Sequence, residues 1–139
     1  MRKIGTALAI VAALLIGLTG CGDDDKAEGT IDVTLSDFKI ELSDASVPAG
    51  EVTFKLDNQG PSLHEFVVFK TDLGLDELPT DDTGDVVEND DFAPLDEIED
   101  IEDGASPELK MDLAAGDYVL ICNVPDHFRQ GMSVSFTVK

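Results

Sequence analysis

The sequence has few cations, few metal-binding side chains and no tryptophan. Its 139 residues include nine Lys and Arg against 30 Asp and Glu, which gives a net charge of −21. A protein that binds the phosphate backbone of nucleic acid needs a basic face, so this composition excludes nucleic acid as a partner. It also argues against a basic amphipathic helix on a membrane surface. The acidity fits steering of a cationic partner, and it fits a saline habitat equally well.

No hydrophobic run is long enough for a transmembrane helix. Residues 4–18 form an uncharged stretch behind a positive Met-Arg-Lys start, whereas a spanning helix needs about 20 apolar residues. The pattern predicts a secretory signal. The stretch ends in Leu18-Thr19-Gly20-Cys21, which resembles the lipobox of bacterial and archaeal lipoproteins. The resemblance implies cleavage before Cys21 and a lipid on this residue, although an ordinary leader with a chance cysteine is the alternative.

The chain divides into a signal peptide (1–20), a flexible tether (21–29) and one domain (30–139). We expect an exported protein, periplasmic or otherwise extracytoplasmic, anchored to the membrane through Cys21. Loss of Arg2 and Lys3 with the leader changes the net charge from −21 to −23.

An acidic insertion occupies residues 71–109 of the domain. It contains sixteen acids and no Lys or Arg. We expect it to be mostly irregular, with helical turns near Leu73–Leu78 and Leu95–Ile101. A loop of this length is either functional or an accommodated insertion, so the acids form either a docking surface or a solvated face.

Elsewhere, apolar and polar residues alternate as in half-buried strands. The alternation from Ile31 to Leu42 changes parity at Phe38, which we interpret as a bulge near Asp37. The run from Leu63 to Phe69 is more continuously apolar and predicts a strand buried on both faces. The whole pattern predicts an all-β fold, an antiparallel Greek-key β-sandwich of about seven to eight strands. We expect four aromatic residues in its core: Phe66, Phe69, Tyr118 and Phe136.

Three of the scarce metal-binding side chains lie close together near the end of the sequence. Cys122, His127 and Met132 follow the pattern C-x4-H-x4-M, and His64 is the only other histidine. A trigonal His, His, Cys set with a weak axial Met is the geometry of a blue-copper site. Zinc is the rival metal, but a thioether is a poor zinc ligand. With Cys21 acylated, Cys122 has no disulfide partner in an oxidising compartment, which favours protection by a metal.

The segment from Cys122 to Met132, with His64 upstream, resembles the cupredoxin family of small blue copper proteins, which includes plastocyanin and azurin. Its Cys-to-His spacing is most similar to the auracyanin, rusticyanin and sulfocyanin branches. The resemblance covers about residues 30–139. It implies one copper ion cycling between Cu(I) and Cu(II), with His64, Cys122 and His127 as equatorial ligands and Met132 as the axial ligand.

One position departs from the family pattern. Many members have Asn directly after the first ligand histidine, where it ties the two ligand loops together. Here Glu65 follows His64 and Asn123 follows Cys122, so we expect Asn123 to take over part of this bracing. Pro125 has no amide hydrogen and cannot donate to the cysteine sulfur. We expect electrons to leave through His127, whose ring would be framed by Pro61, Leu63, Pro125 and Phe128.

Two functions remain open. The first is a monomeric, lipid-anchored electron carrier that docks with a basic redox protein, such as a cytochrome or oxidase domain. The second is a module for copper delivery or buffering, although delivery sites favour exposed Met and His clusters that release the metal. Enzymatic activity is not expected, because no nucleophile set and no second metal cluster is suggested.

Overall fold

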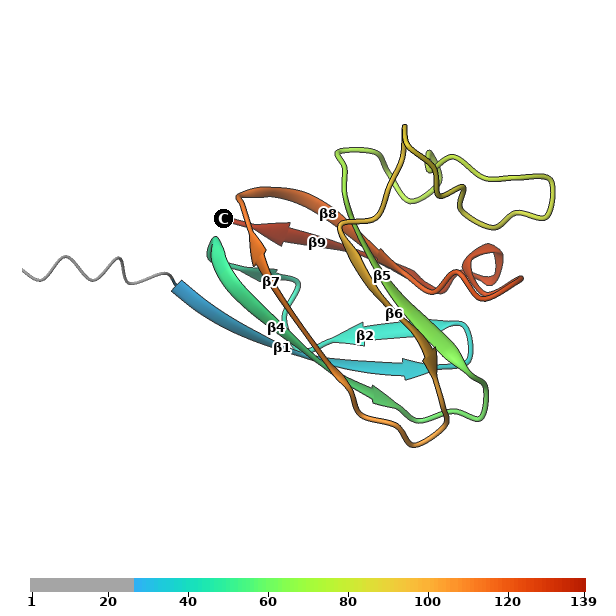
Figure 1. The fold of residues 1–139 in the computed structure, drawn as a ribbon, viewed down its shortest axis with the longest axis horizontal. Helices are drawn as coiled ribbons and strands as arrows, with labels where there is room; N and C mark the ends of the chain where they lie inside the picture. Colours follow the sequence, from blue (N-terminus) through green and yellow to red (C-terminus); the bar gives the residue numbers. More distant parts are fainter. Residues whose placement is uncertain (1–26) are drawn as a thin grey trace, which may run out of the picture.

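Two β-sheets pack face to face in the computed structural model, which describes residues 27–139 (Figure 1). The predicted signal peptide, Cys21 and most of the tether lie outside the described residues. One sheet has the strand order β2-β1-β4-β7 and the other β3-β9-β8-β5-β6. The elements are β1 (Ala27–Ser36), β2 (Lys39–Leu42), β3 (Ser46–Val47), β4 (Gly50–Asn58), β5 (His64–Lys70), β6 (Asp96–Ile101), β7 (Glu108–Leu113), β8 (Gly116–Ile121), η1 (Phe128–Gln130) and β9 (Ser133–Val138).

The predicted all-β sandwich is confirmed, but residues 27–139 form nine strands, more than the seven to eight expected, and each sheet contains one parallel pair and is not purely antiparallel. β1 pairs with β4 in parallel, and β3 pairs with β9 in parallel, while the other pairings are antiparallel. The parallel pairing of β1 and β4 arises because the chain leaves the first sheet through β3 and then returns beside β1. Within residues 27–139, no helix is long and apolar enough to cross a membrane.

The parity change at Phe38 marks a hairpin turn. β1 and β2 pair antiparallel, with Ser36 opposite Lys39, and Asp37 and Phe38 make the connection. The expected bulge is therefore wrong. A two-residue turn moves the following apolar positions by one, just as a bulge does. Phe38 has a φ of 62°, a backbone conformation that costs a bulky residue roughly 1–2 kcal/mol.

β5 and β8, two inner strands of the five-stranded sheet, are buried on both faces. Phe66 and Val68 of β5 point into the main core between the sheets, and Val67 and Phe69 point into a second cluster on the outer face. The prediction for Leu63 to Phe69 is confirmed for the strand itself. Phe66, Phe69, Tyr118 and Phe136 are all at most 2% exposed, so the predicted aromatic core is also confirmed.

The acidic insertion has two structurally different parts. Residues 71–95, which we call the cover loop, run over the outer face of the five-stranded sheet (Figure 1) and bury Leu78 and Val86 in the second cluster. Near Leu73–Leu78 it makes a single turn, in which the amide of Glu77 donates to the carbonyl of Gly74 at 2.9 Å. The helical turn expected near Leu95–Ile101 is wrong. Asp96–Ile101 form β6, because the edge of β5 offers them backbone partners, with a register shift between His64 and Phe66.

Candidate metal centre

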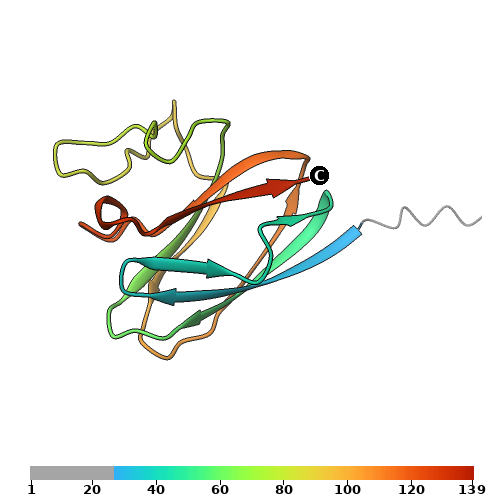
Figure 2. The same ribbon diagram turned by 180° about the vertical axis from the view of Figure 1, so that it is seen from behind.

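The candidate ligands lie at one end of the sandwich. His64 begins β5, Cys122 directly follows β8, and His127 and Met132 lie in the connection to β9. We call residues 122–132 the ligand loop. It lies at the right in Figure 1, opposite the C-terminus, and the view from behind in Figure 2 places the β1–β2 turn at the same end.

Three ligand atoms converge on one point. The Nδ1 atoms of His64 and His127 are 3.2 Å apart. The sulfur of Cys122 lies 3.8 Å from Nδ1 of His64 and 3.4 Å from Nδ1 of His127. Residues far apart in the sequence thus present two imidazole nitrogens and one thiol sulfur at the corners of a small triangle.

This triangle has the dimensions of a metal site. A zinc-sized ion binds imidazole nitrogen at about 2.0–2.1 Å and thiolate sulfur at about 2.3 Å. A trigonal arrangement at those lengths separates two nitrogens by about 3.5 Å, and nitrogen from sulfur by about 3.8 Å. The observed edges of 3.2, 3.4 and 3.8 Å need little adjustment to hold an ion. With Met132 beside them, these donors fit one copper ion.

The ligand side chains are shielded from water. His64, Cys122 and Met132 are fully buried, and His127 is 8% exposed. Burial raises the pKa of the Cys122 thiol to about 11, opposed by the backbone amides of Glu65 and Val124. Burial, and then the neighbouring His127, lower the pKa of His64, while Asp37 raises it. The His64 imidazole thus favours the neutral form that binds metal, whereas the thiol keeps its proton at neutral pH unless a metal ion displaces it.

Backbone hydrogen bonds close the ligand loop on itself. The amide of Cys122 donates to the carbonyl of Met132 at 3.0 Å, and the amide of Met132 donates to the carbonyl of His127 at 3.1 Å. The amide of His127 donates to the carbonyl of Val124 at 2.9 Å. Three predicted ligands are therefore joined by short backbone links, whereas His64 comes from a separate segment.

Glu65 contributes to the site through its backbone. Its amide donates to the Cys122 sulfur at 3.3 Å, a role that Pro125 in the ligand loop cannot fill. The Glu65 side chain lies near other acids of the cover loop and β6. Burial, followed by repulsion from Glu99 and Glu88, raises its pKa to about 7.

Asn123 has a different partner from the one expected. Its side chain does not bridge to the His64 segment. It makes hydrogen bonds to Val86 and Glu88 of the cover loop. Phe128, expected at the rim of the His127 ring, packs instead against the second cluster. Sequence reasoning could not identify these contacts because it did not predict where the cover loop lies relative to the ligand loop.

Three residues that the sequence did not identify contact the site. Phe38 meets the His127 ring edge to face, with centroids 5.3 Å apart, and is itself 39% exposed. Asp37 Oδ1 lies 3.7 Å from His64 Nε2, a buried nitrogen with no hydrogen-bond partner among the described residues. The parity change at Phe38 was the available signal, since it marked the turn that carries both residues.

The third is Asn58, a buried side chain that holds the segment before His64. Its Nδ2 donates to the carbonyls of Ser62 and Ile101 at 2.9 and 2.8 Å, and its Oδ1 accepts from the amide of Gly60 at 2.7 Å. The side chain thus joins the end of β4 to the loop that delivers His64 and to the end of β6.

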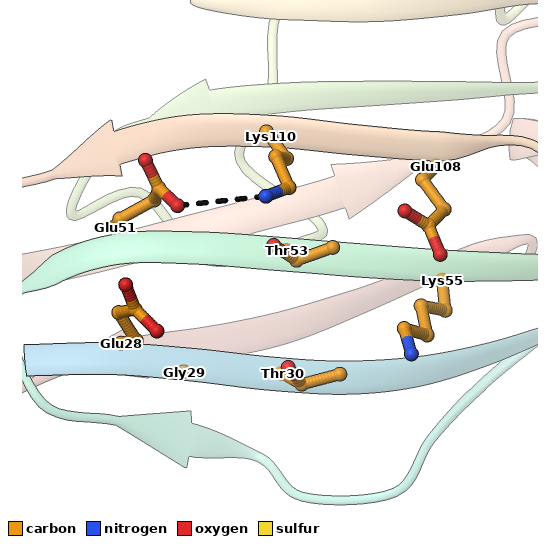
Figure 3. Close-up of a pocket in the computed structure, with 8 residues that line it drawn as sticks. All are labelled: Glu28, Gly29, Thr30, Glu51, Thr53, Lys55, Glu108 and Lys110. Carbon is orange, nitrogen blue, oxygen red and sulfur yellow. Dashed lines mark ion pairs between the residues drawn. The ribbon is translucent and has the colours of Figure 1, made fainter.

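A polar hollow of about 290 Å³ lies elsewhere, on the outer face of the four-stranded sheet (Figure 3). Its lining is mostly charged side chains and threonines, with an ion pair of 3.6 Å between Lys110 and Glu51. None of the four candidate ligands lines it. Its lining contains no histidine, cysteine or methionine, so it is not a second candidate for copper.

Comparisons with known proteins agree with this fold. The sequence profile of the family described as "Cupredoxin-like domain" matches residues 6–134. Reduced auracyanin from Roseiflexus castenholzii superimposes with a TM-score of 0.62 at 21% identity, covering 79% of this chain and 96% of that one.

Two further solved structures are similar in fold. Auracyanin A, described as a "blue" copper protein from Chloroflexus aurantiacus, has a TM-score of 0.56 at 20% identity, covering 81% of this chain and 100% of its own. Reduced rusticyanin has a TM-score of 0.50 at 23% identity, covering 79% of each chain. A search of curated proteins finds no match.

Proposed function

This chain belongs to the cupredoxin-like domain family, and we propose that it is a type 1 copper protein that carries one electron at a time and catalyses no reaction. The observation that supports this function best is the buried triangle of His64 Nδ1, His127 Nδ1 and Cys122 Sγ. When bound there, copper would supply the Cu(I)/Cu(II) couple.

The protein's contribution is to hold the ligands in one arrangement and to exclude water. The ligand atoms of His64, His127 and Cys122 lie within 4.8 Å of one another. Ligands held in a fixed arrangement require little rearrangement when the charge on the metal changes. Burial of all four candidate ligands leaves no open position for a substrate or a second ligand.

A copper titration of the metal-free protein tests the proposal. We expect one Cu(II) per chain and an intense blue colour from thiolate-to-copper charge transfer. Cys122→Ser should abolish the colour, because the sulfur is lost from the triangle. Cys21→Ala is the matched control, since it removes the other cysteine and should leave the spectrum unchanged. A colourless copper complex of the wild type would refute a type 1 site.

Copper delivery or buffering is the alternative, and the burial of the ligands argues against it. A donor of copper must release the ion to its recipient, whereas these ligands have no exposed edge except the 8% of His127. Exchange of bound copper with a chelator separates the two functions. Release within seconds would favour delivery, and retention over hours would favour electron transfer.

For the path of the electron, we propose His127 and Phe38. His127 is the only one of the four ligands with measurable exposure, and the exposed Phe38 ring packs against it. Phe38→Ala should change the electron-exchange rate with a partner more than it changes the spectrum. An unchanged rate would place the exit elsewhere.

We further propose that the partner is basic. Four acids of β6, Asp96, Glu97, Glu99 and Asp100, lie on the edge strand beside β5, the strand that begins with His64. Three of them, Glu99, Glu97 and Asp100, add to the effect of burial in raising the pKa of Glu65. Fields of this kind act mainly on the association rate and are largely screened beyond about 10 Å at 0.1 M salt.

Stopped-flow electron transfer over a salt series tests this partner. Neutralising those four acids should flatten the salt dependence with a cationic cytochrome and leave the blue spectrum unchanged. Neutralising Glu28, Glu41, Glu51 and Glu108 on the four-stranded sheet removes the same charge at a different face. An equal effect from both sets would mean that only net charge matters.

Export and anchoring through Cys21 complete the proposal, supported by the lipobox-like sequence. Intact-mass analysis of membrane fractions should find a chain that begins at an acylated Cys21. An unmodified chain that begins at another residue would contradict it.

A further inference from the structure

The ligand loop is held from outside by the cover loop. The amide of Val86 donates to Asn123 Oδ1 at 2.8 Å, and Asn123 Nδ2 donates back to the carbonyl of Val86 at 3.0 Å. The same Nδ2 donates to Glu88 Oε1 at 2.7 Å. One side chain, next to Cys122 in sequence, therefore satisfies both backbone groups of a residue 37 positions away.

A second tie lies three residues further along the ligand loop. The amide of Asp126 donates to Asp85 Oδ1 at 3.0 Å. Asp126 has a φ of 72°, an uncommon conformation for a residue with a side chain, which needs support from its surroundings. The two ties fall between Cys122 and His127, so three residues of the cover loop, Asp85, Val86 and Glu88, hold the segment that joins two of the candidate ligands.

The holding segment is itself fixed to the sheet. Val86 is 4% exposed and packs in the second cluster with Val119 and Ile121 of β8. The amide of Val87 donates to the carbonyl of Pro79 at 2.9 Å, and Asp81 and Asp85 close the intervening turn with a backbone bond of 3.0 Å. Because Ile121 immediately precedes Cys122, the cover loop and the ligand loop are anchored at the same point.

We propose that residues 85–88 brace the ligand loop through Asn123, which is a positioning residue for the metal centre. The proposal rests on the copper function above and adds to it a role for the acidic insertion. Residues 123–126 accept two backbone hydrogen bonds from within the ligand loop, from the amide of His127 to the carbonyl of Val124 and from the amide of Gln130 to the carbonyl of Asp126. The brace adds four bonds from outside. It therefore sets how far Cys122 and His127 can move apart.

The chemistry of the brace requires an amide. Asn123 accepts one hydrogen bond and donates two, whereas a carboxylate can only accept. An aspartate at this position would face the carbonyl of Val86 and the carboxylate of Glu88 with like charge. Asn123→Asp should therefore weaken the brace at least as much as Asn123→Ala, although it has nearly the same volume.

Hydrogen exchange of the metal-free protein tests the brace without copper. In Asn123→Ala the amides of His127 and Met132 should exchange at least tenfold faster than in the wild type, because the loop that contains them opens more often. Asn89→Ala is the matched control. Asn89 is an asparagine of the cover loop whose side chain accepts only from the amides of its own turn, Asp91 and Phe92. In Asn89→Ala the amides of His127 and Met132 should exchange within twofold of their wild-type rates.

The copper-loaded proteins give a second readout. Loss of a group that orients metal ligands typically costs about 10–100-fold in metal affinity. We expect a chelator to remove copper from Asn123→Ala and Asn123→Asp faster by about that factor. The copper hyperfine splitting in their EPR spectra should also change, a signature that loss of stability alone would not produce. Asn89→Ala should match the wild type in both measurements.

Asp85→Ala and Asp85→Asn keep the test decisive if the Asn123 variants fail to fold. The asparagine retains an acceptor for the amide of Asp126 and should behave like the wild type, while the alanine should speed exchange at His127. Two results would overturn the brace. One is that the Asn123 variants exchange their amides and release copper at the same rates as Asn89→Ala. The other is that Asp85→Ala and Asp85→Asn have the same rates as each other. A wild type that binds no copper would refute the copper function, and the exchange data would still decide the brace.

Discussion

The outer faces of the two sheets differ in what covers them. On the four-stranded sheet, threonines and charged side chains face water around the shallow hollow in Figure 3. On the five-stranded sheet, Val67, Phe69, Val119 and Ile121 are covered by the cover loop. His64 begins β5, Cys122 follows β8 and Met132 precedes β9, all strands of the covered sheet, and His127 lies in the loop between β8 and β9.

The difference shows why the metal centre belongs to the sheet with two buried faces. Alternation in a strand sends neighbouring side chains to opposite faces. In β5 and β8 both sets are packed, so neither strand can rotate or slide without disturbing a core. His64 at the start of β5 and Cys122 after β8 are placed by these rigid strands, and a site on the open sheet would lack that support.

The largest effect should follow from removing an aromatic side chain between the sheets. Phe66 is fully buried and meets Phe54 at 5.3 Å, so Phe66→Ala should cost about 3–5 kcal/mol in the free energy of unfolding. Phe69→Ala, on the covered outer face, should cost less because the cover loop can settle into the space. Urea denaturation of the metal-free proteins measures both. Equal costs would mean that the cover loop is as rigid as a sheet.

Removing the cover loop's own aromatic contact should have an intermediate effect. Phe92 stacks on Phe69 with centroids 4.6 Å apart and planes 14° apart, and such a pair adds about 0.5–1.5 kcal/mol beyond simple burial. We expect Phe92→Ala to cost about 1–2 kcal/mol in the same assay. Leu95→Ala is the control, since Leu95 is 51% exposed. Matching effects would mean that the cover loop is held no more firmly at Phe92 than at its exposed positions.

A smaller, pH-dependent effect should arise at the charged edge strand. Burial, followed by repulsion from Glu88, Glu99 and Asp96, raises the pKa of Glu97. An acid with a raised folded pKa destabilises the fold where it is ionised, and this penalty fades as the pH falls through the folded pKa. Glu97→Gln should therefore stabilise the protein at pH 8, by about 0.5 kcal/mol given the screening of a largely exposed site.

Below the ordinary pKa of 4.5 the glutamate is protonated in both states, so the gain from Glu97→Gln should disappear. Thermal unfolding of the wild type and Glu97→Gln between pH 8 and pH 4.5 or below measures this gain in stability. A gain that persists at low pH would assign the effect to the shape of the side chain and not to its charge.

The smallest effect should come from the open sheet. Lys110 and Glu51 form a 3.6 Å pair with side chains 62% and 47% exposed, and exposed pairs of this kind often contribute little. Lys110→Ala should change the free energy of unfolding by about 0.2 kcal/mol or less and leave the copper spectrum unchanged. A shift in the spectrum would show that the open face is coupled to the metal centre after all.

Much of the site was predictable because its chemistry depends on a few rare residues at short spacings. Cys122, His127 and Met132 lie within one loop, and His64 is the only remaining histidine. The alternating patterns likewise predicted the strands, since burial on one face leaves a period of two in the sequence. The strand at Asp96–Ile101 was missed because most of its residues are charged and its stability comes from pairing with β5.

The sequence by itself determined the ligand types, the all-β class and the two-sided burial of β5, because each depends on side-chain chemistry or on a short local pattern. Only the tertiary structure decided that Asn123 reaches the cover loop, that Asp37 and Phe38 flank the two imidazoles, and that Asn58 holds the segment before His64. These contacts join residues between 4 and 89 positions apart through the folding of separate strands. Their partners are backbone groups and ring edges, which leave no residue-specific mark in the sequence.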